Sequence, residues 1–262
     1  MPFGIANISI IPVRSEPSEK SEMITQILFG EHFEIIKTKD KWCKIKLVFD
    51  NYEGWIDSKL SNLVSDKFIE KLSSKPSYIT SEIFNLITLL SKNSPFWVPA
   101  GCTIPFLNKK TGVFKIGVED YQFMGTTGYK NSKEIRETIK NNAINYLNAP
   151  YLWGGRNPFG IDCSGFSQII YKIAGISIPR DASKQVKKGV AVNFVNESLP
   201  GDLAFFDNDE GEIIHVGIML NKNQIIHASG KVRIDLIDHQ GIFNVDTKRY
   251  THKLRVIKNI IK

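Results

Sequence analysis

Cys163 has the sequence surroundings of a nucleophile. It lies in residues 160–166, Gly-Ile-Asp-Cys-Ser-Gly-Phe, where glycines stand on both sides of the thiol and the apolar spacing that follows predicts a helix. The unpaired N–H groups in the first turn of a helix carry partial positive charge, which favours thiolate over thiol and offers donors to an oxyanion. A small buried residue that seals a helix end would give the same local sequence. This segment alone therefore leaves both interpretations open.

Two histidines interrupt apolar, strand-like segments farther along the chain. His215 and His227 are 12 residues apart. A three-residue hairpin loop between their strands would pair Leu220 with Gln224. It would also place Gly217 opposite His227, so that the two imidazoles become diagonal neighbours on one face. One histidine in such a strand is more often structural, but two favour an active site in which one ring takes a thiol proton and the second orients the first.

Two helices and a run of strands are expected to position these residues. A capping box of Asn131 and Glu134 would begin the first helix, whose apolar residues repeat at helical spacing until Pro150. The second helix should begin at Cys163, capped by Asp162. Strand-like segments follow at residues 203–206, 213–220 and 224–228. Helices followed by antiparallel strands describe an α+β domain.

Residues 1–64 are predicted to form short strands separated by turns. In residues 43–47 apolar and charged side chains alternate, which is the period of a half-buried strand, so Cys43 should point into a core as a packing residue. The segments 13–17, 27–30, 42–45 and 52–56 resemble, in order and spacing, those of a bacterial SH3-like domain.

The middle of the chain, residues 65–128, is predicted to contain a linker and a second, diverged SH3-like barrel. Residues 65–77 are polar and lysine-rich, as in a linker, and a turn at 109–112 between apolar segments suggests a hairpin. Residues 81–90 could equally form a short helix. The third domain then comprises residues 129–262.

The C-terminal part, from Asn131 onward, resembles the NlpC/P60 family. The motifs that carry the resemblance are residues 151–155, 162–166, 178–181, 199–203, 215–218 and 226–229. The resemblance implies a papain-like thiol protease, with Cys163 as nucleophile, His215 as general base and His227 as the orienting third residue. It implies hydrolysis of the γ-D-glutamyl-diamino acid bond in murein (peptidoglycan) peptides without a metal or an organic cofactor.

A branch with SH3-like domains, the γ-D-glutamyl-L-diamino acid endopeptidases of the dipeptidyl-peptidase VI type, is the more similar one. Its members prefer free peptides that begin with L-alanine, as in L-Ala-γ-D-Glu-diamino acid, which suggests a role in recycling murein peptides. The matching substrate-binding positions are Asp181, Tyr151, Ser164, Tyr52 and, with a shifted alignment, Glu22. Asp181 could instead cap a following helix, and Tyr52 could be a packing aromatic. Ala182 departs from the hydroxyl residue expected beside the aspartate.

Composition limits the classes of partner. The chain has 262 residues, of which 42% are hydrophobic, enough for two or three compact domains. Its net charge of +7 favours acidic partners, but no helix-turn-helix or zinc-finger spacing accompanies the basic residues, so we expect no nucleic-acid partner. The three cysteines, about 60 residues apart, form no zinc spacing. The oligomeric state stays open.

The N-terminal residues favour a cytosolic protein. They contain no basic segment, and Pro12 interrupts the apolar run that a signal peptide would need. No stretch approaches about 18 consecutive apolar residues, so we expect no membrane span. If a leader has been removed, the protein would instead be secreted or periplasmic.

Two alternatives to a recycling peptidase stay open from the sequence. The first is a related cysteine enzyme of different outcome, such as an acyltransferase or a secreted lytic endopeptidase that acts on intact peptidoglycan. The second is a non-catalytic protein that binds wall peptides.

Overall fold

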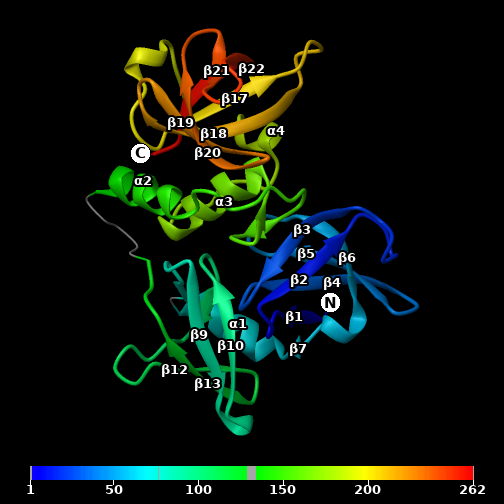
Figure 1. The fold of residues 1–262 in the computed structure, drawn as a ribbon. Coiled ribbons are helices and arrows are strands. Elements are labelled where there is room, and N and C mark those ends of the chain that lie inside the picture. The colour runs from blue at the N-terminus through cyan, green and yellow to red at the C-terminus, as the bar shows by residue number, and fades with distance from the viewer. Residues whose placement is uncertain (1, 76, 129–133, 262) are drawn as a thin grey trace. The chain divides into compact units, whose positions relative to one another are not determined.

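The computed structural model describes residues 2–75, 77–128 and 134–261 (Figure 1). Contacts divide the chain into two compact units, Met1–Gly128 (unit 1) and Tyr129–Lys262 (unit 2). Asn131, the predicted start of the first helix of unit 2, lies outside the described residues.

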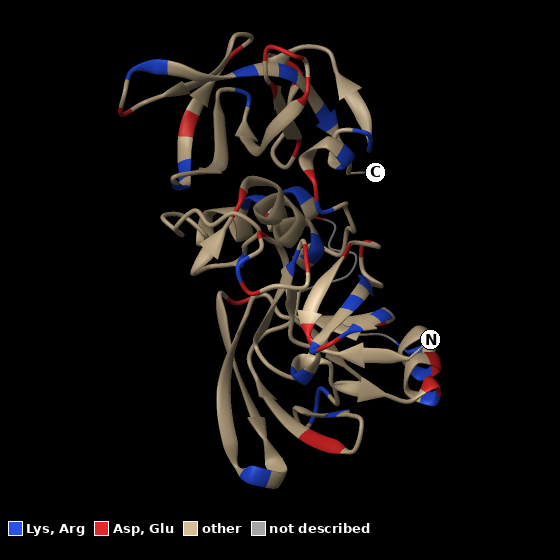
Figure 2. Ribbon diagram, turned by 90° about the vertical axis from the view of Figure 1, so that its right-hand side faces the viewer, with Lys and Arg blue, Asp and Glu red and all other residues tan. Residues whose placement is uncertain are grey.

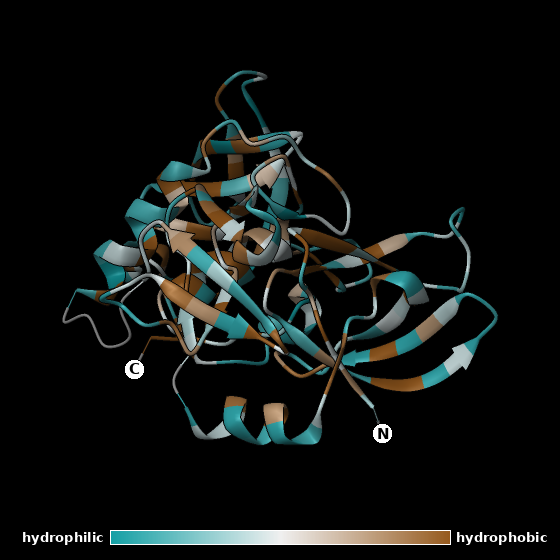
Figure 3. Cartoon of the chain, turned by 90° about the horizontal axis from the view of Figure 1, so that it is seen from below, coloured by the Kyte–Doolittle hydropathy of each residue, from teal (hydrophilic) through white to brown (hydrophobic). Residues whose placement is uncertain are grey.

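The first half of unit 1 is an antiparallel sheet in the order β3-β2-β6-β5-β4-β1-β7. Its strands are β1 (Phe3–Ile5), β2 (Ile10–Arg14), β3 (Met23–Leu28), β4 (His32–Lys39), β5 (Trp42–Leu47), β6 (Glu53–Asp57) and β7 (Leu63–Val64), with a short 3-10 turn, η1 (Ser58–Leu60). Hydrophobic and hydrophilic segments alternate along the strands (Figure 3). Cys43, Ile45 and Leu47 are buried in the core of this sheet, so the predicted strand is confirmed.

The second half of unit 1 is a four-stranded sheet in the order β10-β9-β13-β12 and a two-stranded sheet of β8 and β11. Its elements are α1 (Asp66–Ser74), β8 (Ser77–Ile79), β9 (Phe84–Leu89), η2 (Leu90–Lys92), β10 (Ser94–Pro99), β11 (Thr103–Pro105), β12 (Val113–Ile116) and β13 (Glu119–Met124). The segment that could equally have been a helix, residues 81–90, therefore contains a strand.

Two local features of this region add to the predictions. The polar segment after residue 64 is the helix α1, because Ser65 caps it by accepting a hydrogen bond from Phe68 N and Leu72 is buried beneath it. The predicted turn at residues 109–112 is present, with hydrogen bonds from Gly112 N to Asn108 O and from Asn108 N to Val113 O, and it precedes β12. The hairpin of paired strands joins β12 to β13 and turns at Gly117 and Val118. Gly117 has φ +59°, a conformation that glycine adopts easily, and this sets the turn.

Phe29 links the two halves of unit 1. Its ring contacts the rings of Phe96, Phe114 and Tyr121 in the second half, with centroids 5.7–5.9 Å away. The following residue, Gly30, has φ +75°, and a Cβ there would lie 1.8 Å from the carbonyl oxygen of Thr103. This close approach requires glycine.

Unit 2 begins with helices and ends with strands, as the predicted α+β class requires. Its elements are α2 (Ile135–Asn145), β14 (Arg156–Asn157), β15 (Gly160–Ile161), α3 (Cys163–Ile173), α4 (Ala182–Gln185), β16 (Val190–Val192), η3 (Val195–Glu197), β17 (Leu203–Asp207), β18 (Ile213–Asn221), β19 (Gln224–Ser229), β20 (Lys231–Ile237), β21 (Gly241–Asn244) and β22 (Arg249–Asn259). The fold class is confirmed for this part.

Strands β17 to β22 close into an antiparallel barrel, because β22 pairs with both β17 and β21. Apolar side chains from all six strands fill its interior: Ala204, Phe206, Met219, Ile225, Ile237, Ile242 and Ile257. Helix α3 packs against β18 and β19 (Figure 1). The barrel therefore presents two neighbouring strands to the helix that begins at the cysteine.

Charged residues are interspersed along the ribbon of both units (Figure 2). No helix within the described part of the chain combines the length and apolar character that crossing a membrane needs.

Candidate active site

Helix α3 begins at Cys163, as predicted. Asp162 is its N-cap, and the Asp162 Oδ1 atom accepts a hydrogen bond of 2.6 Å from Gly165 N. A Cβ at Gly165 would lie 2.3 Å from the carbonyl oxygen of Gly155, so the close contact of this turn with the preceding loop requires glycine. Cys163 is 8% exposed. Its thiol thus sits at a fixed, almost buried helix start.

Buried polar side chains hold this helix start in place. The Arg180 guanidinium donates to Asp162 Oδ1 at 2.9 Å and to Ser164 Oγ at 2.8 Å, and Gly154 N donates to Asp162 Oδ2 at 2.8 Å. Arg180 is 2% exposed, so this ion pair is shielded from solvent. Ser164 is a predicted substrate contact, but in this network its hydroxyl oxygen accepts a hydrogen bond from Arg180.

The Cys163 thiol is neutral at rest. Burial raises its pKa to about 11, the charge of Asp162 adds to the rise, and the Val216 N–H, the Arg180 charge and the Ser164 N–H oppose it. The thiolate expected from the helix start alone is therefore not the resting form. The Val216 contact places the sulfur beside strand β18, next to His215.

The register of β18 and β19 brings the two predicted histidines together. Gly217 pairs with His227, as predicted, although Asn221 rather than Leu220 pairs with Gln224. The loop is one residue shorter than expected, and a bulge in β18 restores the register. His215 Nε2 lies 2.9 Å from His227 Nδ1. The two rings are thus joined by a hydrogen bond.

Gly217 makes this approach possible. A Cβ at this position would lie 2.6 Å from Ile225 Cδ1 and 2.9 Å from His227 Cβ. Both distances are shorter than packed side chains tolerate. The glycine between the two strands therefore leaves room for the second imidazole.

A buried aspartate continues the line of histidines. Asp235 Oδ2 lies 3.1 Å from His227 Nε2, and Asp235 is 1% exposed. Arg233 donates to both of its oxygens, at 2.7 and 3.0 Å, and Val245 N donates at 3.0 Å. Burial by itself would raise the pKa of Asp235, but hydrogen bonds from His227, Arg233 and Val245 N outweigh it and lower the pKa to about 2.

Asp235 was not predicted from the sequence, although a local signal for it exists. Gly230 closes a tight turn between β19 and β20, and Arg233 pairs with His227 across it. That register puts Asp235 diagonally across from His227 on the same face. The pairing could have been derived from the turn, whereas the burial of that face depends on barrel closure.

His252 is a third histidine that the sequence analysis missed. Its ring stacks on that of His215, with centroids 4.2 Å apart and planes 26° apart. Burial, together with the charge of His227, lowers the pKa of His252 to about 4. No local pattern marks this residue, because β22 reaches the other strands only when the barrel closes.

The His215 imidazole is also neutral at rest. Burial lowers its pKa well below 6.5, and the neighbouring His227 and His252 lower it further. A neutral thiol beside a neutral imidazole can react by passing the thiol proton to the ring as the sulfur attacks. The site therefore has the parts of a cysteine nucleophile with a histidine base.

The predicted binding residues divide between the units. Tyr151 lies close to Cys163: burial raises the pKa of its phenol to about 12, and the Cys163 and Asp162 charges add to the rise. Asp181 precedes α4 but does not cap it with its side chain, which instead binds Lys184 Nζ at 3.1 Å.

Tyr52 and Glu22 belong to unit 1. Tyr52 packs against the core of the first sheet, and Glu22 is exposed just before β3. Their contribution to substrate binding stays a prediction.

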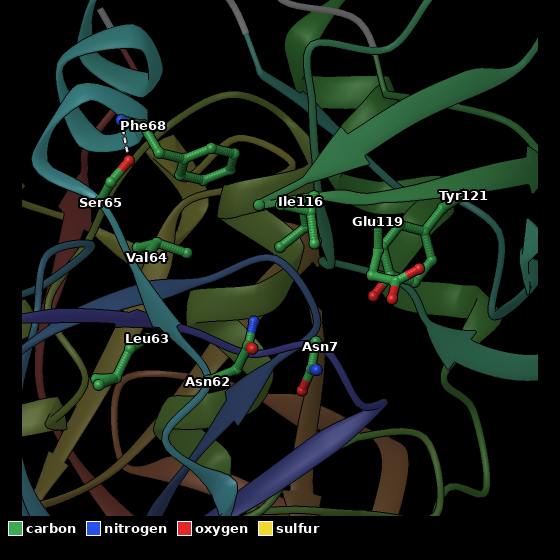
Figure 4. Close-up of a pocket in the computed structure, with 11 residues that line it drawn as sticks. Asn7, Asn62, Leu63, Val64, Ser65, Phe68, Ile116, Glu119 and Tyr121 are labelled. Carbon is green, nitrogen blue, oxygen red and sulfur yellow. Dashed lines mark hydrogen bonds between the residues drawn. The ribbon is translucent and has the colours of Figure 1, made fainter. Parts of the chain in front are cut away.

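Unit 1 has a pocket of its own, with a volume of about 360 Å³ (Figure 4). Asn7, Asn62 and Glu119 supply polar groups to it, and Phe68 lines it beside the Ser65 cap. Among the described residues that line this pocket there is neither a cysteine nor a histidine. The described residues also contain no group of three or more histidine, cysteine, aspartate or glutamate side chains arranged to hold a metal ion.

Comparisons with known proteins identify the family of each unit. Residues 148–254 match the NlpC/P60 family, and residues 13–59 match the bacterial dipeptidyl-peptidase Sh3 domain. The chain is 30% identical over 229 residues to a gamma-D-glutamyl-L-lysine dipeptidyl-peptidase of Bacillus cereus, which covers 79% of this chain and 68% of that protein. It is 26% identical over 253 residues to dipeptidyl-peptidase 6 of Lysinibacillus sphaericus, covering 86% and 88%. A crystal structure of an NlpC/P60 family protein from Bacillus cereus shares the fold, with a TM-score of 0.81 at 21% identity over 99% of this chain and 100% of that one.

Proposed function

Because this chain belongs to the NlpC/P60 family of cysteine peptidases, we propose that it hydrolyses the bond between γ-linked D-glutamate and a diamino acid in murein peptides. The observation that carries the proposal has two parts. The Cys163 thiol contacts Val216 on β18, next to His215, and His215 is hydrogen-bonded to His227. Relatives named for γ-D-glutamyl-L-lysine cleavage support the choice of bond.

In this proposal Cys163 is the nucleophile and His215 the base. The thiol proton passes to His215 Nδ1, the ring nitrogen that His227 does not engage, while Sγ bonds to the carbonyl carbon. The backbone N–H of Cys163, at the start of α3, helps to receive the oxyanion. His215 then gives its proton to the leaving amine as the C–N bond breaks. Water, deprotonated by the same ring, hydrolyses the thioester and restores the thiol.

The substrate is proposed to be a free peptide with N-terminal L-alanine. A dipeptidyl-peptidase, the activity named in the relatives, removes two residues from a free amino end. Asp181 offers a carboxylate for that α-amino group, and in the structure it binds the ammonium of Lys184, a group of the same chemistry. This ion pair is partly exposed, with side chains 59% and 32% exposed, so a substrate amine can displace Lys184 at little cost.

Mass spectrometry of peptide digestion tests the proposal. L-Ala-γ-D-Glu-L-Lys should be cleaved to L-Ala-D-Glu and lysine, and the N-acetylated peptide should be cleaved far more slowly. Equal cleavage of both peptides would remove the amine-pocket argument, and cleavage of intact peptidoglycan instead of either peptide would favour a lytic role. A preference for the free peptide would support recycling of murein peptides in the cytosol.

A further inference from the structure

Asp235 is surrounded by hydrogen-bond donors. It lies on the face of β20 that turns into the barrel, beside Ile237 of the interior cluster. Its carboxylate accepts from Arg233 at both oxygens and from Val245 N, and neither donor can reverse its role. His227 Nε2 is the remaining partner, at 3.1 Å, and an imidazole can either donate or accept.

These contacts determine which nitrogen of each ring carries its proton. A carboxylate with a pKa of about 2 is ionised at neutral pH and only accepts hydrogen bonds, so His227 must carry its proton on Nε2. In the neutral ring, His227 Nδ1 then has only a lone pair to offer. The 2.9 Å contact from His215 Nε2 is therefore an N–H donated to His227, and His215 Nδ1 keeps a lone pair.

We propose that Asp235, held by Arg233, is a positioning residue that acts through His227 to fix His215 in the tautomer able to take the Cys163 proton. This inference rests on the proposed function in one respect, the assignment of Cys163 as the nucleophile. Asp235 touches neither the thiol nor a substrate, and its effect on the reaction passes through two rings.

Among the groups around the two histidines, Asp235 is the one that can fix their tautomers. His215 faces Phe206 on β17, His227 on β19, His252 on β22 and, beside Val216, the Cys163 thiol of α3. His252 stacks face to face, and its Nδ1 atom lies 2.9 Å from Thr251 Oγ1. Within the described part of the barrel, the carboxylate bonded to the histidine pair is therefore that of Asp235.

Replacing Asp235 with asparagine would reverse the direction of the hydrogen bonds and switch both histidines to the other tautomer. The asparagine NH2 group must face either the Val245 N–H side or the His227 side. Arg233 donates on both sides, so one arginine hydrogen bond is lost in either orientation and does not decide between them. The choice falls to the other partner on each side: Val245 N cannot accept a hydrogen bond, whereas His227 can switch and accept on Nε2. His227 would then carry its proton on Nδ1 and donate to His215 Nε2, which leaves the His215 proton on Nδ1, where the base needs a lone pair.

Nitrogen-15 NMR spectra of the histidine rings read this order directly and need no substrate. In the wild-type protein we expect His227 and His215 both protonated on Nε2, with resonances assigned through single substitutions of the five histidines. In Asp235→Asn both protons should move to Nδ1. A wild-type spectrum with His227 protonated on Nδ1 overturns the proposal even if the variant fails to fold, and so does a folded Asp235→Asn variant that keeps both protons on Nε2.

Kinetics provide the second readout. We expect Asp235→Asn to lower kcat for L-Ala-γ-D-Glu-L-Lys by a factor on the order of 10², with KM within about twofold, because a wrong tautomer in the Ser-His-Asp triad costs about 10⁴ and one more ring lies between. The residual rate should rise steeply with pH as Cys163 ionises by itself. A variant with switched tautomers and unchanged kcat overturns the proposal.

Asp238→Asn is the matched control. Its carboxylate also accepts hydrogen bonds, from Tyr250 and from Gln240 N, but it does not bond to the histidines. It should keep the wild-type tautomers and rate. If the wild-type protein cleaves none of the peptides, the proposed function fails, while the tautomer spectra still decide the role of Asp235.

Discussion

Each unit of this molecule folds an antiparallel sheet around a buried interior, but the two interiors differ in composition. The core cluster of the first sheet of unit 1 is apolar throughout and includes Cys43. In the barrel of unit 2, His215, His227 and Asp235 lie beside the same kind of apolar cluster. Both sheets bury enough apolar surface to fold, and the barrel also accommodates a connected line of ionisable groups.

The difference shows where chemistry can be placed in a β-barrel. An unpaired charge buried in an apolar interior is unstable, so each buried ionisable group needs a partner. In unit 2 every member of the line has one: His215 with His227, His227 with Asp235, and Asp235 with Arg233. The same burial that stabilises Cys43 as a packing residue keeps His215 neutral and able to accept a proton.

The two cysteines give the largest expected contrast. Cys163→Ala should abolish peptide hydrolysis, with a fall in kcat of about 10⁵-fold or more, because the nucleophile is removed. Cys43→Ala should keep the wild-type kcat and lower the free energy of unfolding by about 1 kcal/mol, the cost of a small cavity. Mass spectrometry of digestion and urea titration measure the two effects. Hydrolysis by Cys163→Ala at the wild-type rate would contradict the assignment.

Two strand glycines extend the contrast to the backbone. Gly217→Ala places a Cβ against His227 and should lower kcat by about 10 to 100-fold, since small displacements of a catalytic group are costly. In Gly4→Ala a Cβ would lie 2.5 Å from Phe33 Cε2 in unit 1. That overpacking should lower the free energy of unfolding by about 1–3 kcal/mol without changing kcat of the folded enzyme. An equal loss of kcat in both variants would show that general destabilisation explains the effect.

Acid should weaken the barrel of unit 2 through its buried histidines. His215 and His252 have folded pKa values below 6.5, about 4 for His252. Between pH 6.5 and 4 the unfolded chain therefore binds protons that the folded chain does not, and the free energy of unfolding falls as pH falls. His252→Phe keeps a stacked ring but removes one such site.

Hydrogen exchange at pH 7 and pH 4.5 measures this effect in each unit. In the wild-type protein, the free energy of opening measured for peptides from β17–β19 should be lower at pH 4.5 than at pH 7. In His252→Phe this decrease should be smaller by about 1–2 kcal/mol, a range that allows for the partial exposure of the ring. Peptides from the first sheet of unit 1 serve as the internal reference. Identical losses in wild type and His252→Phe would exclude His252 as a source of acid sensitivity.

The sequence was sufficient for the parts of the site that depend on local pattern. The helix start at Cys163 follows from its cap and glycines, and the pairing of Gly217 with His227 follows from the distance between the two strands, even though the loop length was off by one. Asp235 and His252 depend on barrel closure, which brings β20 and β22 to the histidines from later in the chain. A polar residue on a strand gives no sign by itself that its face will be inside.

The thiol's protonation state also needed the three-dimensional structure. A helix start lowers the pKa of a cysteine, while burial raises it, and the sequence specifies only the first influence. In the folded protein burial outweighs the helix start, and the pKa of Cys163 rises to about 11. The role of Ser164 also depends on the folded structure. Its hydroxyl is next to the nucleophile in sequence but accepts a hydrogen bond from Arg180.

The smallest expected effect concerns an ion pair outside the barrel. Asp235 is buried and its partner Arg233 is 15% exposed, whereas the Asp181 and Lys184 side chains are 32% and 59% exposed. The second pair should therefore contribute at most about 1 kcal/mol to the free energy of unfolding. Lys184→Ala removes the competing ammonium and should lower KM for the free peptide by about two- to fivefold, with kcat unchanged. Lys187→Ala removes the same charge at an exposed position and should leave KM within about 1.5-fold of the wild-type value. This control separates competition by Lys184 for Asp181 from the effect of the overall positive charge of the protein. If Lys184→Ala lowers KM for the N-acetylated peptide by the same factor, Asp181 does not bind the substrate amine.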